Sequence, residues 1–207
     1  MKNTFFLLTL AALLTACTST VEQYNRAQAF YSAGDYAAAI PLYRAAAMDG
    51  STEAQLMLAK CYDFGQGVPQ DMTQAVRWYA LAAEGGNTNA QDNLGTCYAT
   101  GSGVPKDLRL AYQWYNRAAA AGDASALNNL GLCYRNGEGV LQDEARAADC
   151  FRRSAALGNA DGQYNLGRCY FHGLGVAQDE AQARFWVQKA ASQGHKNATL
   201  FAQDNNW

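Results

Sequence analysis

The sequence lacks the glycine- and proline-rich composition that sets disordered and fibrous proteins apart from ordered globular ones. Glycine and proline account for only 19 and 3 of the 207 residues, and 49% of the residues are hydrophobic. This composition excludes a disordered or collagen-like chain. The net charge is only −2, from 16 basic and 18 acidic residues, and no run of like charges concentrates it. A basic surface that binds nucleic acid is therefore not expected.

Catalytic and metal-binding motifs are also missing. No serine begins Ser-x-x-Lys or lies at the centre of Gly-x-Ser-x-Gly, and His-Glu-x-x-His does not occur. A zinc site needs clustered thiolates or imidazoles, but the two histidines, His172 and His195, lie 23 positions apart. The sequence therefore predicts no enzyme, no metal site and no cofactor.

The N-terminal apolar stretch is too short to span a bilayer. It covers residues 5–14, whereas a transmembrane helix needs about 20 apolar residues. Because it follows Lys2, it is typical of a secretory signal, which we place at residues 1–16. Leu14-Thr15-Ala16-Cys17 also resembles the lipobox of bacterial lipoproteins. The alternative is that Cys17 is an ordinary apolar residue of a cleaved signal.

The lipobox resemblance implies where the protein resides. In such lipoproteins the chain is cleaved before the cysteine, which is acylated, so residues 17–20 would form a lipidated linker. Thr18, not aspartate, follows Cys17. The resemblance therefore implies anchoring to the periplasmic side of the outer membrane, where two or three acyl chains hold a protein more firmly than one.

The chain does contain a repeat of 36 residues. Four Cys-Tyr pairs, four Gly-x-Gly-Val segments, four aspartates and four closing glycines recur at this interval. The four copies cover residues 52–87, 88–123, 124–159 and 160–195. The markers of the register are Cys61, Cys97, Cys133 and Cys169, and Asp71, Asp107, Asp143 and Asp179.

Each copy is predicted to form two helices. In residues 89–99 the apolar positions recur at the spacing of one helical face, and Gly95 on that side would let a neighbouring helix approach closely. Asp107 is predicted to cap the second helix, which Gly122 ends. This capping role explains the aspartate of every repeat better than a catalytic one.

These residues resemble the Sel-one-like repeat, a branch of the tetratricopeptide-like helical families. The resemblance covers residues 52–195 and implies an all-α fold, a right-handed α-solenoid superhelix of antiparallel helix pairs. Residues 21–51 are similar to a divergent tetratricopeptide-like repeat. Residues 196–207 begin another first helix, which we expect to cap the stack.

The cysteines are expected to remain thiols. If Cys17 is lipidated, five remain, and four of these occupy equivalent sites in successive repeats. Equivalent sites are separated by at least one helix packing distance of ~8–10 Å, beyond the ~7 Å Cα limit for a disulfide. A bridge from Cys150 to Cys133 or Cys169 remains open. Buried thiols in narrow helix contacts are the favoured interpretation.

Cys150 also departs from the repeat pattern. It occupies the position that holds Trp78, Trp114 and Trp186 in the other copies. A tryptophan buries ~150–250 Å² of surface. The sequence therefore predicts that the repeat over residues 124–159 is the loosest.

The resemblance implies a partner-binding concave face lined by the first helix of each repeat. Asn93, Asn129 and Asn165, here called the asparagine series, are predicted to hydrogen-bond the backbone of an extended peptide. A solvated structural role is the alternative. Further candidates are Lys60, Phe64, Arg168 and His172, because aromatic and arginine residues are frequent at binding hot spots.

The expected function is that of a lipid-anchored protein-binding scaffold or adaptor in the cell envelope. Its partners would be a protein or peptide on the concave face and the membrane through the lipid, but not nucleic acid. One alternative is a periplasmic immunity protein that neutralises a secreted toxin. Another is a penicillin-binding or β-lactamase-type enzyme, as suggested for cysteine-rich relatives whose Cys-x7-Cys spacing is missing here.

Overall fold

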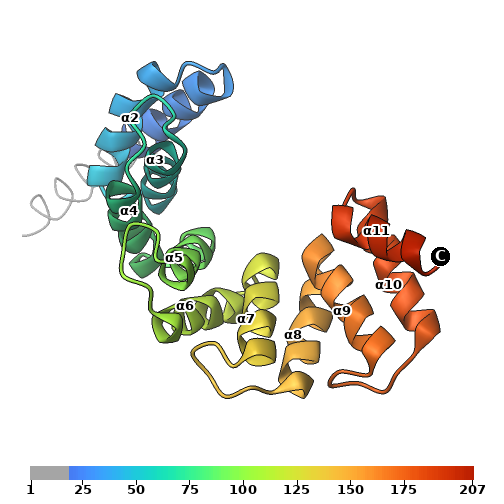
Figure 1. Ribbon diagram of the computed structural model, residues 1–207. Helices are drawn as coiled ribbons and strands as arrows, with labels where there is room; N and C mark the ends of the chain where they lie inside the picture. The colour runs from blue at the N-terminus through green and yellow to red at the C-terminus, as the bar shows by residue number, and fades with distance from the viewer. Residues whose placement is uncertain (1–18) are drawn as a thin grey trace, which may run out of the picture. The chain divides into compact units, whose positions relative to one another are not determined.

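The computed structural model describes residues 19–207, and within this range all the regular elements are helices (Figure 1). Residues 1–18, which include the predicted signal and Cys17, lie outside the described residues. The first helix covers residues 19–32 and so includes residues 19 and 20, which the sequence predicts as linker. The others are α2 (Tyr36–Met48), α3 (Thr52–Phe64), α4 (Met72–Glu84), α5 (Thr88–Thr100), α6 (Leu108–Ala120), α7 (Ala124–Asn136), α8 (Glu144–Ala156), α9 (Ala160–His172), α10 (Glu180–Ser192) and α11 (Lys196–Asp204).

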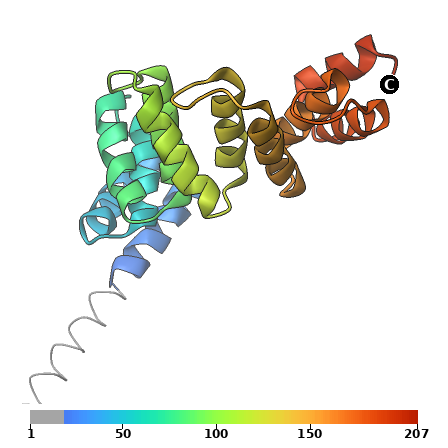
Figure 2. The same ribbon diagram turned by 90° about the horizontal axis from the view of Figure 1, so that it is seen from below.

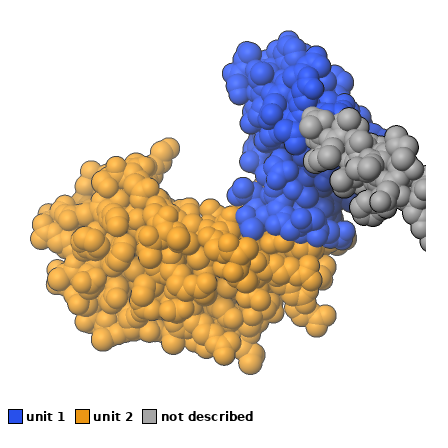
Figure 3. All heavy atoms as spheres, turned by 180° about the vertical axis from the view of Figure 1, so that it is seen from behind, with its two compact units in different colours: residues 1–90, 102–104 blue, residues 91–101, 105–207 orange. Residues whose placement is uncertain are grey.

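The helices pack in chain order within two compact units, shown in Figure 3. In unit 1, which extends to residue 90 and adds 102–104, α2 packs on α3 and α3 on α4. In unit 2, residues 91–101 and 105–207, each helix from α6 to α11 packs on the next (Figure 1 and Figure 2). The predicted fold class, an all-α solenoid of antiparallel helix pairs, is confirmed.

The repeated aspartates are helix caps. The Asp71 carboxylate accepts a hydrogen bond from the backbone N–H of Gln74 at 3.0 Å, at the start of α4. Such a bond satisfies a backbone donor that has no partner within the helix. The capping prediction is confirmed for the whole series, because equivalent bonds are made by Asp35, Asp107, Asp143 and Asp179.

The Gly-x-Gly-Val segments are turns that contact the preceding repeat. Gly139 has a φ of +74°, and a Cβ atom there would lie 2.1 Å from the carbonyl oxygen of Leu108. Only glycine combines this left-handed conformation with so close an approach. The second glycine of the motif is thus required by packing between repeats.

Large side chains of the second helices fill space left by small residues of the first helices. A Cβ atom on Gly95 would lie 2.7 Å from the ring of Tyr115, and one on Gly131 would lie 2.5 Å from the ring of Phe151. The predicted close approach at Gly95 is confirmed. Phe151 is completely buried, so these contacts form part of the core.

The five cysteines of residues 19–207 are buried and form no disulfide bond with one another. Burial raises the pKa of the Cys61, Cys150 and Cys169 thiols to about 11 and that of Cys133 to about 12. Cys150, in the tryptophan position, is only 5% exposed, and Trp186 packs against the same core cluster.

Candidate protein-binding surface

The candidate residues of unit 1 lie on α3. Lys60 is half-buried, whereas Phe64, the last residue of the helix, is 65% exposed. An apolar ring this exposed offers contact area to a partner. The other candidates among the described residues belong to unit 2: Asn93, Asn129, Asn165, Arg168 and His172.

Two members of the asparagine series connect successive repeats of unit 2. Asn129 on α7 donates from Nδ2 to Asp92 Oδ1 on α5, at 2.8 Å. Burial raises the pKa of Asp92 to about 6, and the charge of Asp123 adds to this rise, while the bond from Asn129 opposes it. Asn93, the neighbour of Asp92, is half-buried.

The same connection recurs one repeat later without a carboxylate. Asn165 on α9 donates from Nδ2 to Asn128 Oδ1 on α7, at 2.8 Å. Its Oδ1 accepts a hydrogen bond from Arg135 Nη1 at 3.1 Å, and Asn165 is only 8% exposed.

These bonds favour the structural interpretation of Asn129 and Asn165. Their side-chain amides are already engaged with neighbouring repeats, so a peptide would have to compete with those bonds. Peptide binding by the asparagine series stays a prediction. The hydrogen bonds do show that the face of α7 and α9 that carries Asn129 and Asn165 has a polar network.

Arg135 is a feature of this face that the sequence analysis missed. It is half-buried on α7, and its pKa is lowered by burial and by the nearby positive charge of Arg168 on α9. Neither guanidinium has an ion-pair partner among residues 19–207. Because the position of Arg135 holds Asp63, Ala99 and Phe171 in the other copies, the repeat pattern does not distinguish it.

Aromatic side chains adjoin the two arginines, and we call Tyr164, Phe171, Phe201 and Trp207 the aromatic cluster. Phe171 lies 5.2 Å from Phe201 and 5.6 Å from Trp207, between ring centroids. The Arg168 guanidinium lies 5.8 Å from the centroid of the Tyr164 ring, within cation–π range. All four rings are only half-buried, and His172, beside Phe171, is exposed. The cluster thus offers apolar surface beside positive charge.

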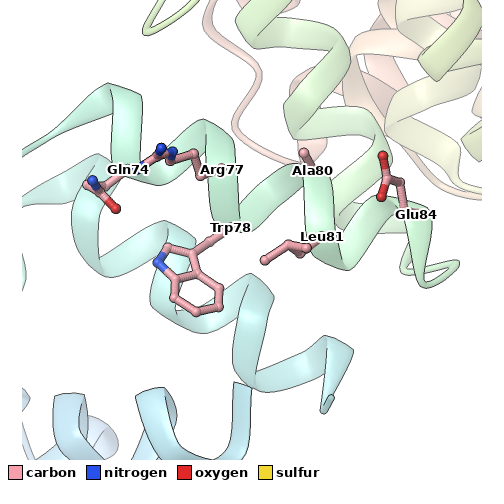
Figure 4. A pocket seen from close by; sticks show the side chains of 6 residues that line it. All are labelled: Gln74, Arg77, Trp78, Ala80, Leu81 and Glu84. Atoms are coloured by element: carbon pink, nitrogen blue, oxygen red, sulfur yellow. The ribbon is translucent and has the colours of Figure 1, made fainter. Parts of the chain in front are cut away.

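A separate hollow of about 490 Å³ lies along α4 in unit 1 (Figure 4). Trp78 and Leu81 contribute apolar side chains to its lining, and Leu81 is 49% exposed. Arg77 and Glu84 contribute opposite charges. Gln74 and Ala80 complete its lining, which holds no thiol or hydroxyl side chain.

The described residues contain no group of three or more His, Cys, Asp or Glu side chains placed to hold a metal ion. His195 Nε2 lies 3.0 Å from an oxygen of Asp161, and its Nδ1 accepts from the backbone N–H of Ala198 at the start of α11. Within residues 19–207 no helix has the length and apolar character needed to cross a membrane.

Comparison with known proteins identifies the repeat. The Sel1 repeat family model matches residues 52–87, 88–123, 124–159 and 160–195. No curated protein matches the sequence.

Two solved structures are similar to the chain at more than 30% identity. A Sel1 repeat protein from Oxalobacter formigenes is 32% identical, with a TM-score of 0.82 over 86% of this chain and 73% of that one. The protein c5321, a protective antigen present in uropathogenic Escherichia coli strains, is 36% identical, with a TM-score of 0.80 over 86% of this chain. The match spans only 39% of the c5321 chain.

More distant structures share the fold alone. The immunity protein PA5087 from Pseudomonas aeruginosa is 22% identical, with a TM-score of 0.56 over 84% of this chain and 68% of that one.

Proposed function

The chain belongs to the Sel1 repeat family, and on this premise we propose that it is a lipid-anchored scaffold or adaptor of the cell envelope that binds another protein. The observation that carries the proposal is the surface of α7, α9 and α11. It presents two arginines without ion-pair partners among the described residues, next to half-buried aromatic rings. Arginine and aromatic residues supply much of the binding energy at protein interfaces.

The membrane anchor is the second part of the proposal. It is supported by the sequence Leu14-Thr15-Ala16-Cys17, and Thr18 favours the outer membrane. An acylated protein with two or three chains would stay on the periplasmic face and present its repeats to the envelope.

Crosslinking and purification from the native envelope test both parts. We expect the wild type to fractionate with the outer membrane and to recover a specific protein partner, and Cys17→Ala to lose the membrane association. The matched control is Thr18→Asp, which keeps the cysteine and should move the protein to the inner membrane. A Cys17→Ala variant that remains with the outer membrane would contradict the anchor. A wild type that recovers no specific protein would contradict the adaptor function.

An immunity protein is the second candidate. It is compatible with the fold, since the immunity proteins PA5087 and PA5088 of Pseudomonas aeruginosa share it. Rescue of cells from a co-encoded toxin would favour this function over general scaffolding.

The proposal assigns no chemical reaction to the chain. Labelled penicillin should therefore neither become attached to the purified protein nor be hydrolysed by it. Either outcome would favour a penicillin-binding or β-lactamase-type enzyme instead.

A further inference from the structure

Arg135 and Arg168 form a concentrated positive charge in a chain whose overall charge is negative. Arg135 donates to Asn165 Oδ1 at 3.1 Å and to Asn136 Oδ1 at 3.3 Å, but both acceptors are neutral amides. These bonds orient the guanidinium without cancelling its charge. Burial is the largest cause that lowers the pKa of Arg135, the charge of Arg168 lowers it further, and the carboxylate of Glu138 opposes both.

The two guanidiniums lie on the same face of the repeats. Asn165, which holds Arg135, and Arg168 are three positions apart on α9 and therefore lie on the same side of that helix. Arg135 also lies 5.8 Å from the Phe151 ring centroid, as Arg168 does from that of Tyr164. Each planar guanidinium is thus positioned by an aromatic ring.

We propose that Arg135 and Arg168 bind carboxylates of an acidic segment of the partner protein, and that the aromatic cluster receives an apolar residue of the same segment. The inference rests on the proposed function and names the chemistry of the partner. Guanidinium groups match carboxylates with paired, charge-assisted hydrogen bonds, and an anion here would relieve the repulsion between the arginines. The adjacent rings favour a protein segment over a small free anion.

The test begins with short random peptides displayed on phage and selected against the full chain. The selected peptides should be rich in Asp and Glu with at least one apolar neighbour. A fluorescein-labelled copy of the best peptide is then compared with an analogue in which Asn and Gln replace Asp and Glu. We expect the analogue to bind at least about tenfold more weakly.

The variants locate the binding site. R135Q/R168Q should weaken binding of the acidic peptide at least about tenfold, and R168Q alone should weaken it in the same direction. The matched control, R152Q/R153Q, removes the same charge from exposed positions on α8 and should leave binding unchanged. The Arg168 side chain makes no hydrogen bond to a described residue. R168Q therefore tests the site even if loss of the Arg135 bonds perturbs folding, which circular dichroism would reveal.

Three outcomes would overturn the inference. The peptides selected against the wild type could lack acidic residues, or a selection against R135Q/R168Q could enrich the same peptides equally well. The two double variants could bind the acidic peptide equally. Binding of the protein to anionic phosphatidylglycerol vesicles could depend on the two arginines, while binding of the peptide does not. If R135Q/R168Q still recovers the wild-type partner from the envelope, the adaptor function stands and only this inference fails.

Discussion

At the scale of single residues, Ser154 and Gly162 form a compensated pair. The equivalent positions 36 residues earlier in the chain, Ala118 and Ala126, both hold alanine. The Ser154 hydroxyl donates to the carbonyl of Ala124 at 2.7 Å, and a Cβ atom on Gly162 would lie 2.3 Å from that hydroxyl oxygen. The larger residue on α8 therefore requires the smaller one on α9.

This pairing predicts the sign of a substitution that helix propensity alone would get wrong. Alanine is a better helix former than glycine by about 1 kcal/mol. Gly162→Ala should nevertheless destabilise the protein by about 1–3 kcal/mol, because the new methyl group overpacks the contact. Adding Ser154→Ala removes the hydroxyl but leaves the Cβ atom of residue 154, which would lie 2.6 Å from the new methyl group, so it should restore only part of the lost stability. Ser154→Ala alone is the control. Urea unfolding measures all three, and a stable Gly162→Ala would contradict the argument.

At the scale of helices, the connections from α5 to α7 and from α7 to α9 differ in one charge. Asp92 accepts the first bond and Asn128 the second, at the same position of successive repeats. An asparagine at position 92 would keep an oxygen acceptor for Asn129 and remove the buried charge. The two connections are therefore natural controls for one another.

The raised pKa of Asp92 predicts a pH-dependent stability. Folding raises its pKa from 3.8 to about 6, so the folded state binds the proton more tightly than the unfolded state. Protonated Asp92 therefore contributes to the free energy of unfolding. This contribution is fully present below the pKa of Asp92 in the unfolded state and is lost as the pH rises through its pKa in the folded state. Since one pKa unit corresponds to ~1.4 kcal/mol and partial exposure reduces the effect, Asp92→Asn should stabilise the protein by about 1–2 kcal/mol at neutral pH.

Urea unfolding across this pH range measures the effect. The advantage of Asp92→Asn should disappear under acidic conditions, where the wild-type carboxylate is protonated in both states. Asn128→Asp should behave in the opposite way and lose stability at neutral pH. Parallel pH profiles for the wild type and Asp92→Asn would show that the carboxylate is not the cause.

At the scale of the whole molecule, the buried thiols report how each repeat opens. Because they are buried, and burial raises the pKa of Cys61, Cys133, Cys150 and Cys169, these thiols should react slowly with iodoacetamide until their repeat unfolds. Repeat proteins can open repeat by repeat. The absence of a tryptophan at Cys150 predicts that Cys133 and Cys150 are alkylated before Cys97 in mild urea. Mass spectrometry after pulse labelling would measure the order, and equal rates at Cys97 and Cys133 would refute it.

The sequence by itself determined the helices and the family, because their signals are local and recur every 36 residues. Asp71 caps its helix through a backbone donor only three residues away. The 36-residue repeat places Gly95 on the helical face that packs against a neighbouring helix. Contacts between variable side chains were decided only by the tertiary structure. Arg135 donates a hydrogen bond to Asn165, 30 residues later in the chain, and the Phe171 ring contacts that of Trp207, 36 residues later. The repeat pattern fixes which helices are neighbours, but the packed chain determines which of their non-repeating side chains touch.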